Sequence, residues 1–185
     1  MEGQGPTANM GFKKPHIVVV FGLVALVVAL ICQIIAVAAT GWYTVKNTDD
    51  TYGLWGICTQ GVCLDYMWAD DTIKATRAFA LLGIFFIIFS LTAGILIMFI
   101  EKYVMNLIAG GVAIAAGVFV VVGIAIFLGY HLHDKITADT LHYFQLSYCF
   151  ALSIVAFVLC LASGIAFFLA TSFEDPGSYL IPSKF

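Results

Sequence analysis

The chain has 185 residues, of which 62% are hydrophobic and only 10% are charged. This composition lies outside the range of soluble globular domains and indicates a protein that resides in lipid. Its eight Lys and Arg are scattered and its formal net charge is −3, so the sequence offers no basic surface for a nucleic acid and excludes that partner. No Pro-rich, Ser-rich or charged linker divides the chain, which predicts a single domain over residues 1–185.

Four apolar stretches are each long enough to cross a bilayer, which takes roughly 20 helical residues. None of them contains Asp, Glu, Lys or Arg, and such a charge at a helix centre costs about 2.5 to 3.5 kcal/mol on insertion. We therefore predict four transmembrane helices that form one bundle. They cover residues 16–39, 78–100, 107–130 and 144–171.

The first stretch also fits a cleavable signal peptide, because Lys13 and Lys14 precede it. Its apolar core exceeds the roughly 15 residues that are usual in signal sequences, so we favour a retained helix. An even number of spans places both termini on one side of the membrane. Lys13 and Lys14 border the first span, and Cys58 and Cys63 suit an oxidising compartment, which together predict cytoplasmic termini in a plasma-membrane protein.

This orientation defines an outer loop at 40–77, a cytoplasmic turn at 101–106, a second outer loop at 131–143 and a cytoplasmic tail at 172–185. Small residues recur at multiples of four along the third span, where they favour close helix packing within the bundle over a dimer contact. The residues of this line are Ala109, Ala113, Gly117, Ala125 and Gly129.

The first outer loop contains two cysteines separated by four residues. Gln60 and Gly61 between them predict a two-residue hairpin turn, with Cys58 and Cys63 facing each other across it. We predict a disulfide, since no further ligands lie nearby for a metal pair. After the bridge apolar and polar residues alternate, which predicts a strand with Leu64, Tyr66 and Trp68 on one face.

The aromatic residues Trp42, Tyr43 and Trp55 are expected at the boundary between lipid and water. The loop contains a set of residues in a characteristic order: Trp42, Gly53, Leu54, Trp55, Cys58 and Cys63. This set resembles the signature of the claudins, peripheral myelin protein and the epithelial membrane proteins.

The resemblance implies a left-handed four-helix transmembrane bundle with a small extracellular antiparallel β-sheet, to which the second outer loop adds a strand. The fold class is thus an all-α membrane protein with a small sheet. Arg77 also matches the claudin pattern, and by resemblance it ties the sheet to the bundle near Trp42. The intervals from Trp42 to Gly53 and between the cysteines are shorter than in typical claudins, which predicts a reduced sheet.

The leading functional hypothesis is a claudin-like protein of cell–cell contacts, which seals or organises the junction by binding like or related four-span proteins in cis or in trans. The loop residues that would face a partner or an ion are Asp65, Tyr66, Trp68, Asp70 and Asp71. Their acidic members would favour cations if the loop lined a paracellular path, although a merely solvated acidic loop is the simpler interpretation.

The alternative is an auxiliary subunit that binds a channel or receptor laterally and alters its trafficking or gating. The spans lack the intramembrane charges of transporters, and Gln33, Ser90 and Thr92 are interpreted as interhelical hydrogen-bonding groups. No pattern supports an enzyme or a cofactor. His131 and His133 in the acidic second outer loop are interpreted as solvated side chains, so no metal is expected.

The chain ends in Ser183, Lys184 and Phe185, a Ser-x-apolar carboxyl terminus that resembles a ligand for PDZ scaffolds. An unstructured end is the simpler interpretation. A PDZ scaffold therefore stands as a further candidate partner beside membrane lipid.

Overall fold

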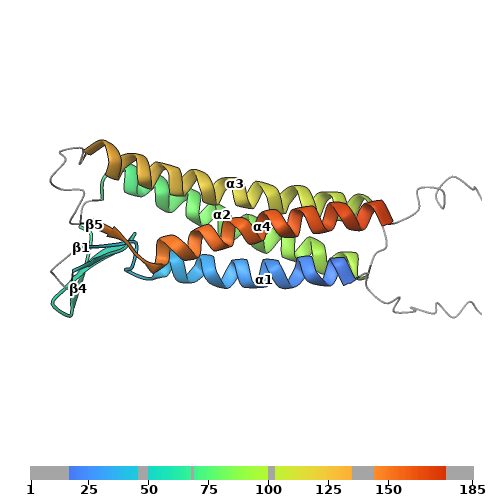
Figure 1. Ribbon diagram of the computed structural model, residues 1–185, viewed down its shortest axis with the longest axis horizontal. Helices are drawn as coiled ribbons and strands as arrows, with labels where there is room; N and C mark the ends of the chain where they lie inside the picture. The colour runs from blue at the N-terminus through green and yellow to red at the C-terminus, as the bar shows by residue number, and fades with distance from the viewer. Residues whose placement is uncertain (1–16, 46–49, 68, 100–102, 135–143, 174–185) are drawn as a thin grey trace, which may run out of the picture.

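The structure is a computed structural model that describes residues 17–45, 50–67, 69–99, 103–134 and 144–173. Its helices are α1 (Ile17–Ala38), α2 (Asp71–Ile97), α3 (Tyr103–Asp134) and α4 (Tyr148–Phe173). They form an elongated bundle in which each helix packs against two neighbours, in the ring α1–α2–α3–α4 (Figure 1). All four are long and apolar enough to cross a membrane, which confirms the predicted spans.

Helices α2 and α3 extend well beyond the apolar windows that predicted them. α2 begins at Asp71 instead of Ala78, and its first turn carries an ion pair between Lys74 Nζ and Asp71 Oδ1 at 2.9 Å. α3 begins at Tyr103 and continues to Asp134, so it takes in part of each loop predicted beside it. Hydropathy marks only the lipid-facing length of a helix, whereas polar turns can continue it into water.

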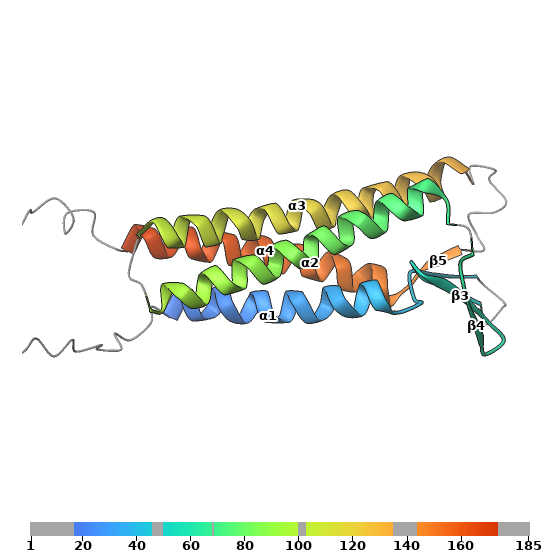
Figure 2. The same ribbon diagram turned by 180° about the vertical axis from the view of Figure 1, so that it is seen from behind.

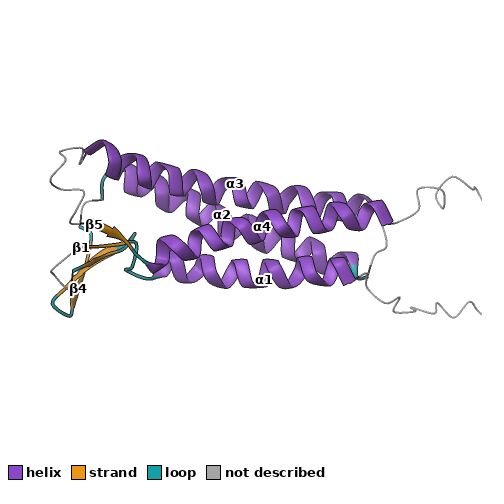
Figure 3. Ribbon diagram, in the orientation of Figure 1, coloured by secondary structure: helices purple, strands orange, loops and turns teal. Residues whose placement is uncertain are grey.

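The bundle carries a small antiparallel sheet at one end (Figures 2 and 3). Its order is β4-β3-β2-β1-β5, so that β4 and β5 are the edge strands. The first four strands come from the loop between α1 and α2, and the fifth comes from the segment before α4. The bounds are β1 (Tyr43–Val45), β2 (Thr51–Tyr52), β3 (Gly56–Thr59), β4 (Val62–Asp65) and β5 (Phe144–Leu146). Each strand has only two to four residues, but all five belong to one hydrogen-bonded sheet.

Strand β5 corrects the predicted start of the fourth span. The sequence predicts residues 144–146 as part of the helix, but they pair with β1 in the register Tyr43↔Leu146 and Thr44↔Gln145. An apolar run can serve a helix or a strand, and here β1 offers an open row of backbone partners. The second outer segment therefore does add a strand, as the family resemblance implied.

The distribution of buried and exposed side chains in the bundle is typical of a protein in lipid. Small and apolar side chains such as Leu26, Ala29 and Ile87 fill the interior, while large apolar residues such as Phe21 and Phe85 point outward. Outward apolar side chains are stable in a hydrocarbon solvent and costly in water. The fold thus requires the membrane that the composition indicates.

The predicted line of small residues on α3 lies only partly in the interior. Ala109, Ala113 and Gly117 are buried, but Ala125 and Gly129 are exposed. A spacing of four residues drifts by about 40° per step around a 3.6-residue helix, so five steps turn the line through about 200°. Its half nearer the sheet consequently faces outward.

The polar residues within the spans have different roles. Ser90 Oγ on α2 donates to the carbonyl of Ala109 on α3 at 2.9 Å, as predicted for an interhelical group. Thr92 instead bonds the carbonyl of Ile88 in its own helix, at 2.9 Å, which corrects that prediction. Ser163 on α4 bonds the carbonyl of Gly22 on α1 at 2.9 Å, and this bond fixes the height of α4 against α1.

Candidate functional site

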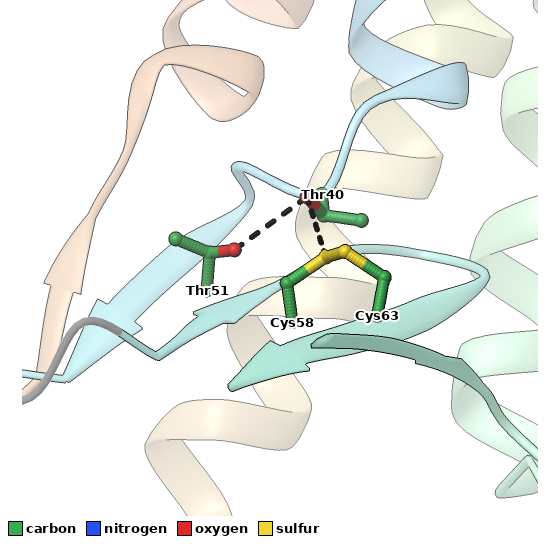
Figure 4. Close-up of a disulfide and its surroundings, with 4 residues drawn as sticks. All are labelled: Thr40, Thr51, Cys58 and Cys63. Carbon is green, nitrogen blue, oxygen red and sulfur yellow. Dashed lines mark hydrogen bonds between the residues drawn. A yellow bond between two sulfur atoms is a disulfide. The ribbon is translucent and has the colours of Figure 1, made fainter. Parts of the chain in front are cut away.

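The β3–β4 hairpin is closed by a disulfide between Cys58 and Cys63, which confirms the predicted pair (Figure 4). The cysteines are directly opposite each other in the strand register, and Thr59 pairs with Val62 beside the turn. Gln60 and Gly61 both have positive φ, 51° and 82°, which a two-residue turn of this type requires. The covalent bond holds the register of a strand pair that is too short to hold it alone.

The disulfide lies against the corner where α1 ends and the sheet begins. Thr40 Oγ1 lies 3.6 Å from Cys58 Sγ and receives a long hydrogen bond of 3.5 Å from Thr51 Oγ1 (Figure 4). Gly53 is needed at the same corner, because a Cβ at this position would lie 2.6 Å from the Thr40 Cα. The first glycine of the signature therefore allows the loop to pass close to the backbone after α1.

Two tryptophans cap the end of α1. The last four carbonyls of any helix lack intrahelical partners, and an unsatisfied carbonyl is costly near a bilayer core. Trp42 Nε1 donates to the carbonyl of Ala36 at 2.7 Å, and Trp55 Nε1 donates to the carbonyl of Val37 at 2.9 Å. Both signature tryptophans therefore complete the last turn of the first span.

The two rings differ in their surroundings. Trp42 is only 1% exposed and packs against Phe127 of α3, with ring centroids 4.7 Å apart. The Trp42 ring is therefore buried at the end of the bundle that carries the sheet and does not itself face the surroundings. Trp55 is 41% exposed and remains at the surface beside the helix end.

Arg77 links the sheet segment to α2. Its Nε donates to the carbonyl of the fully buried Leu54 at 2.7 Å, and its guanidinium carbon lies 4.7 Å from the centroid of the Trp55 ring. The first contact is a charge-assisted hydrogen bond and the second a cation–π contact, each worth on the order of 1 kcal/mol. Arg77 thus connects α2 to the loop through Leu54 and Trp55.

Tyr66 completes the attachment from the far side of the hairpin. Its hydroxyl donates to the carbonyl of Gly53 at 3.3 Å, and its backbone N–H donates to the carbonyl of Trp55 at 3.0 Å. Burial, and to a lesser degree Tyr52, raise the pKa of the Tyr66 hydroxyl, while the Arg77 charge lowers it. The three residues of the Gly-Leu-Trp triplet are therefore all engaged by their surroundings.

Strand β4 presents its side chains to solvent. All four of its residues are exposed, Leu64 at 70%, and Met67 just beyond the strand is exposed at 90%. The strand ends at Asp65, so the predicted strand is wrong at Tyr66, whose hydroxyl instead points back to the carbonyl of Gly53. Trp68 and the carboxyl-terminal Ser183, Lys184 and Phe185 lie outside the described residues.

The other predicted loop residues do not form one cluster. Asp65 belongs to the exposed edge strand, whereas Asp70 and Asp71 lie at the start of α2, where Asp71 pairs with Lys74. Among the residues that the structure describes, no group of three metal-ligating side chains comes together. The acidic side chains of Asp65, Asp70 and Asp71 thus do not converge on one site.

The capping role of the two tryptophans was missed from the sequence. The sequence gives no clear signal for it, because Gly41 follows Ala38-Ala39-Thr40 and a glycine is the common cap at the end of a helix. The carbonyls of Ala36 and Val37 nevertheless take their donors from the two indoles. Distance along the chain does not reveal which donors these are.

A four-helix membrane bundle with a disulfide-closed sheet, attached through Trp42, the Gly-Leu-Trp triplet and Arg77, defines a claudin-like four-span membrane protein. The model of the PMP-22/EMP/MP20/Claudin family matches residues 16–167, and the chain belongs to this family. It is similar to epithelial membrane protein 1 of Rattus norvegicus and of Mus musculus. Each is 28% identical over 137 residues, which cover 72% of this chain and 84% of the relative.

Proposed function

We propose that the protein acts at cell–cell contacts of the plasma membrane, where its sheet meets like or related four-span proteins. Both termini are then cytoplasmic and the sheet is extracellular. The disulfide supports this orientation, because such bonds persist in oxidising compartments. Membership of a family that includes claudins supports the junctional role.

The observation that carries the proposal is the exposed apolar edge of the sheet. Val62 and Leu64 lie on one face of the edge strand β4, and Met67 follows them, all with most of their surface exposed. Apolar side chains held in water favour contact with another surface. An edge strand also offers unpaired backbone groups to such a partner.

The rigid attachment of the sheet adds a second argument. Arg77 donates a hydrogen bond to the backbone of the loop at Leu54. The indoles of Trp42 and Trp55 bond the same loop to the end of α1. A contact surface fixed in this way loses little conformational entropy when it binds. The four apolar windows carry no Asp, Glu, Lys or Arg, the residues that mark transport and proton-relay sites within a membrane. Their absence from the windows agrees with a bundle that supports the sheet as a contact surface.

The experiment is expression in a leaky epithelial monolayer with measurement of electrical resistance and ion preference. We expect the protein to concentrate at cell borders and to raise resistance. A Val62→Ser, Leu64→Ser variant should abolish both effects while retaining the disulfide. The matched control is Ile34→Ser, Ile35→Ser, which removes two exposed apolar side chains from α1 and leaves the strands of the sheet unchanged. Unchanged resistance with the wild-type protein would remove the barrier role.

A cation preference would come from the acidic residues beside the sheet. Asp65 and Asp71 are exposed, and together they outnumber the nearby Lys74 that pairs with Asp71. Asp65→Asn should then reduce cation over anion permeability without lowering resistance. Equal permeability of the two ions in wild-type cells would leave these residues as merely solvated charges.

An auxiliary subunit is the second candidate, and one observation favours it. A Cβ added at Gly111 or Gly129, on the outer side of α3, would meet no described atom of the protein within 4 Å, so a partner helix could approach closely there. Co-purification with one channel at fixed stoichiometry, lost in Gly111→Leu, would support this function. Continuous border staining without such a complex would support the contact function.

A further inference from the structure

Arg77 has binding capacity that the fold does not use. A guanidinium carries five N–H donors, and among the residues that the structure describes only the one on Nε is bonded, to the carbonyl of Leu54. Within the described part of the chain, no carboxylate pairs with Arg77 and no acceptor bonds its two terminal nitrogens. The guanidinium carbon lies 4.7 Å from the centroid of the Trp55 ring and 5.9 Å from that of the Tyr66 ring, and the side chain is only partly buried.

The position of Arg77 along α2 places its guanidinium beside the membrane surface. Leu81 and Leu82 are exposed apolar side chains about 6 Å deeper along the helix axis, at the start of the lipid-facing length. On the neighbouring helix α1, the carbonyl of Val37 accepts a hydrogen bond from the Trp55 indole. Val37 lies about one turn beyond the exposed Ile34. Trp and Arg side chains are typical of this boundary between hydrocarbon and headgroups.

We propose that Arg77, oriented by Trp55 and Leu54, binds the phosphate of a phospholipid headgroup in the leaflet next to the sheet. Phosphate matches the forked geometry of two terminal guanidinium nitrogens. The lipid would then be held by the same residue that fixes the Gly-Leu-Trp triplet to α2. The sheet is thereby seated on the membrane surface as well as on the bundle.

The chain contains a single arginine, so [15N]arginine labels this site alone. The full chain is reconstituted in phosphatidylcholine bilayers, and 15N–31P dipolar dephasing is measured by solid-state NMR. We expect strong dephasing of the two terminal nitrogens, at a nitrogen–phosphorus separation of about 4 Å, and weaker dephasing of Nε. Absence of dephasing at the terminal nitrogens would overturn the proposal.

Two controls separate this site from other sources of contact. In bilayers of an uncharged galactolipid with added inorganic phosphate, we expect little dephasing, and a signal equal to that in phosphatidylcholine would identify a free-anion site and overturn the proposal. The exchange variant Lys74→Arg, Arg77→Lys keeps one arginine and the same charge but moves the guanidinium to the exposed partner of Asp71. Dephasing in it as strong as in wild type would show unspecific headgroup contact, which also contradicts the proposal. The wild-type measurement needs no substitution and stands if this variant does not fold.

Discussion

The indole of Trp42 closes the last turn of α1 by donating a hydrogen bond of 2.7 Å to the carbonyl of Ala36. The neighbouring carbonyl of Val37 receives the indole of Trp55 in the same way, at 2.9 Å. The sheet is therefore bonded directly to the end of a transmembrane helix. This relationship makes the stability of the sheet and that of the bundle depend on each other.

Replacement of Trp42 by Phe tests this dependence. The variant keeps a buried ring but leaves the carbonyl of Ala36 without its donor, so we expect a loss of about 1 to 3 kcal/mol in the free energy of unfolding. Trp55→Phe is the matched control. Its ring is 41% exposed, water or headgroups can replace the lost donor, and the loss should be smaller. Unfolding in detergent followed by circular dichroism gives both values, and equal losses would contradict the capping argument.

Gly53→Ala tests the close approach of the loop to the end of α1. The new methyl group would meet the backbone at Thr40 Cα, 2.6 Å away, and backbone cannot yield as a side chain can. We expect destabilisation of about 1 to 3 kcal/mol and a loss of surface expression. Gly111→Ala is the control, since its Cβ position is open and alanine favours a helix. A Gly53→Ala protein as stable as Gly111→Ala would show that the corner is looser than described.

Removal of the disulfide should cost about 2 kcal/mol, the chain entropy of closing so short a ring. The change is Cys58→Ser with Cys63→Ser, measured by thermal unfolding with and without dithiothreitol. Reductant should lower the transition temperature of the wild type and leave the double variant unchanged. A shift in transition temperature of the same size in both proteins would show that the reductant does not act through the Cys58–Cys63 disulfide.

Tyr66 predicts a loss of stability at high pH. Burial raises its folded pKa above the ordinary value of 10.0, so the folded state holds this proton more tightly than the unfolded chain does. The stabilisation is fully present below pH 10 and is lost as the pH rises through the folded pKa, when the bond to the Gly53 carbonyl can no longer be donated. Unfolding from about pH 8 to about pH 11 should converge for wild type and Tyr66→Phe at the alkaline end. A constant difference across this range would contradict the assignment.

Much of this arrangement could be predicted from the sequence, because the governing patterns are local. The charge-free lengths define the four spans, and the residues Gln60 and Gly61 between the cysteines define the hairpin. The fold class and the family resemblance are confirmed by the structure and by the family match. These features depend on residues that are neighbours in the chain.

The remainder depends on contacts between distant segments. The apolar pattern predicts residues 144–146 as the start of a helix. Their pairing partner, β1, lies about 100 residues earlier in the chain, so no local pattern indicates that they form a strand. The burial of Trp42 depends on Phe127, which no pattern near Trp42 indicates. Ala125 and Gly129 face outward because a spacing of four drifts around the helix.

The most direct test of the account is the distribution of the protein in a mixed epithelial layer, where expressing cells touch both expressing and non-expressing neighbours. If the exposed edge of the sheet binds like molecules across the contact, the protein will concentrate at borders between two expressing cells, and Val62→Ser with Leu64→Ser will abolish that enrichment. A uniform distribution of the wild-type protein over all cell surfaces, with the disulfide intact, would contradict the central claim.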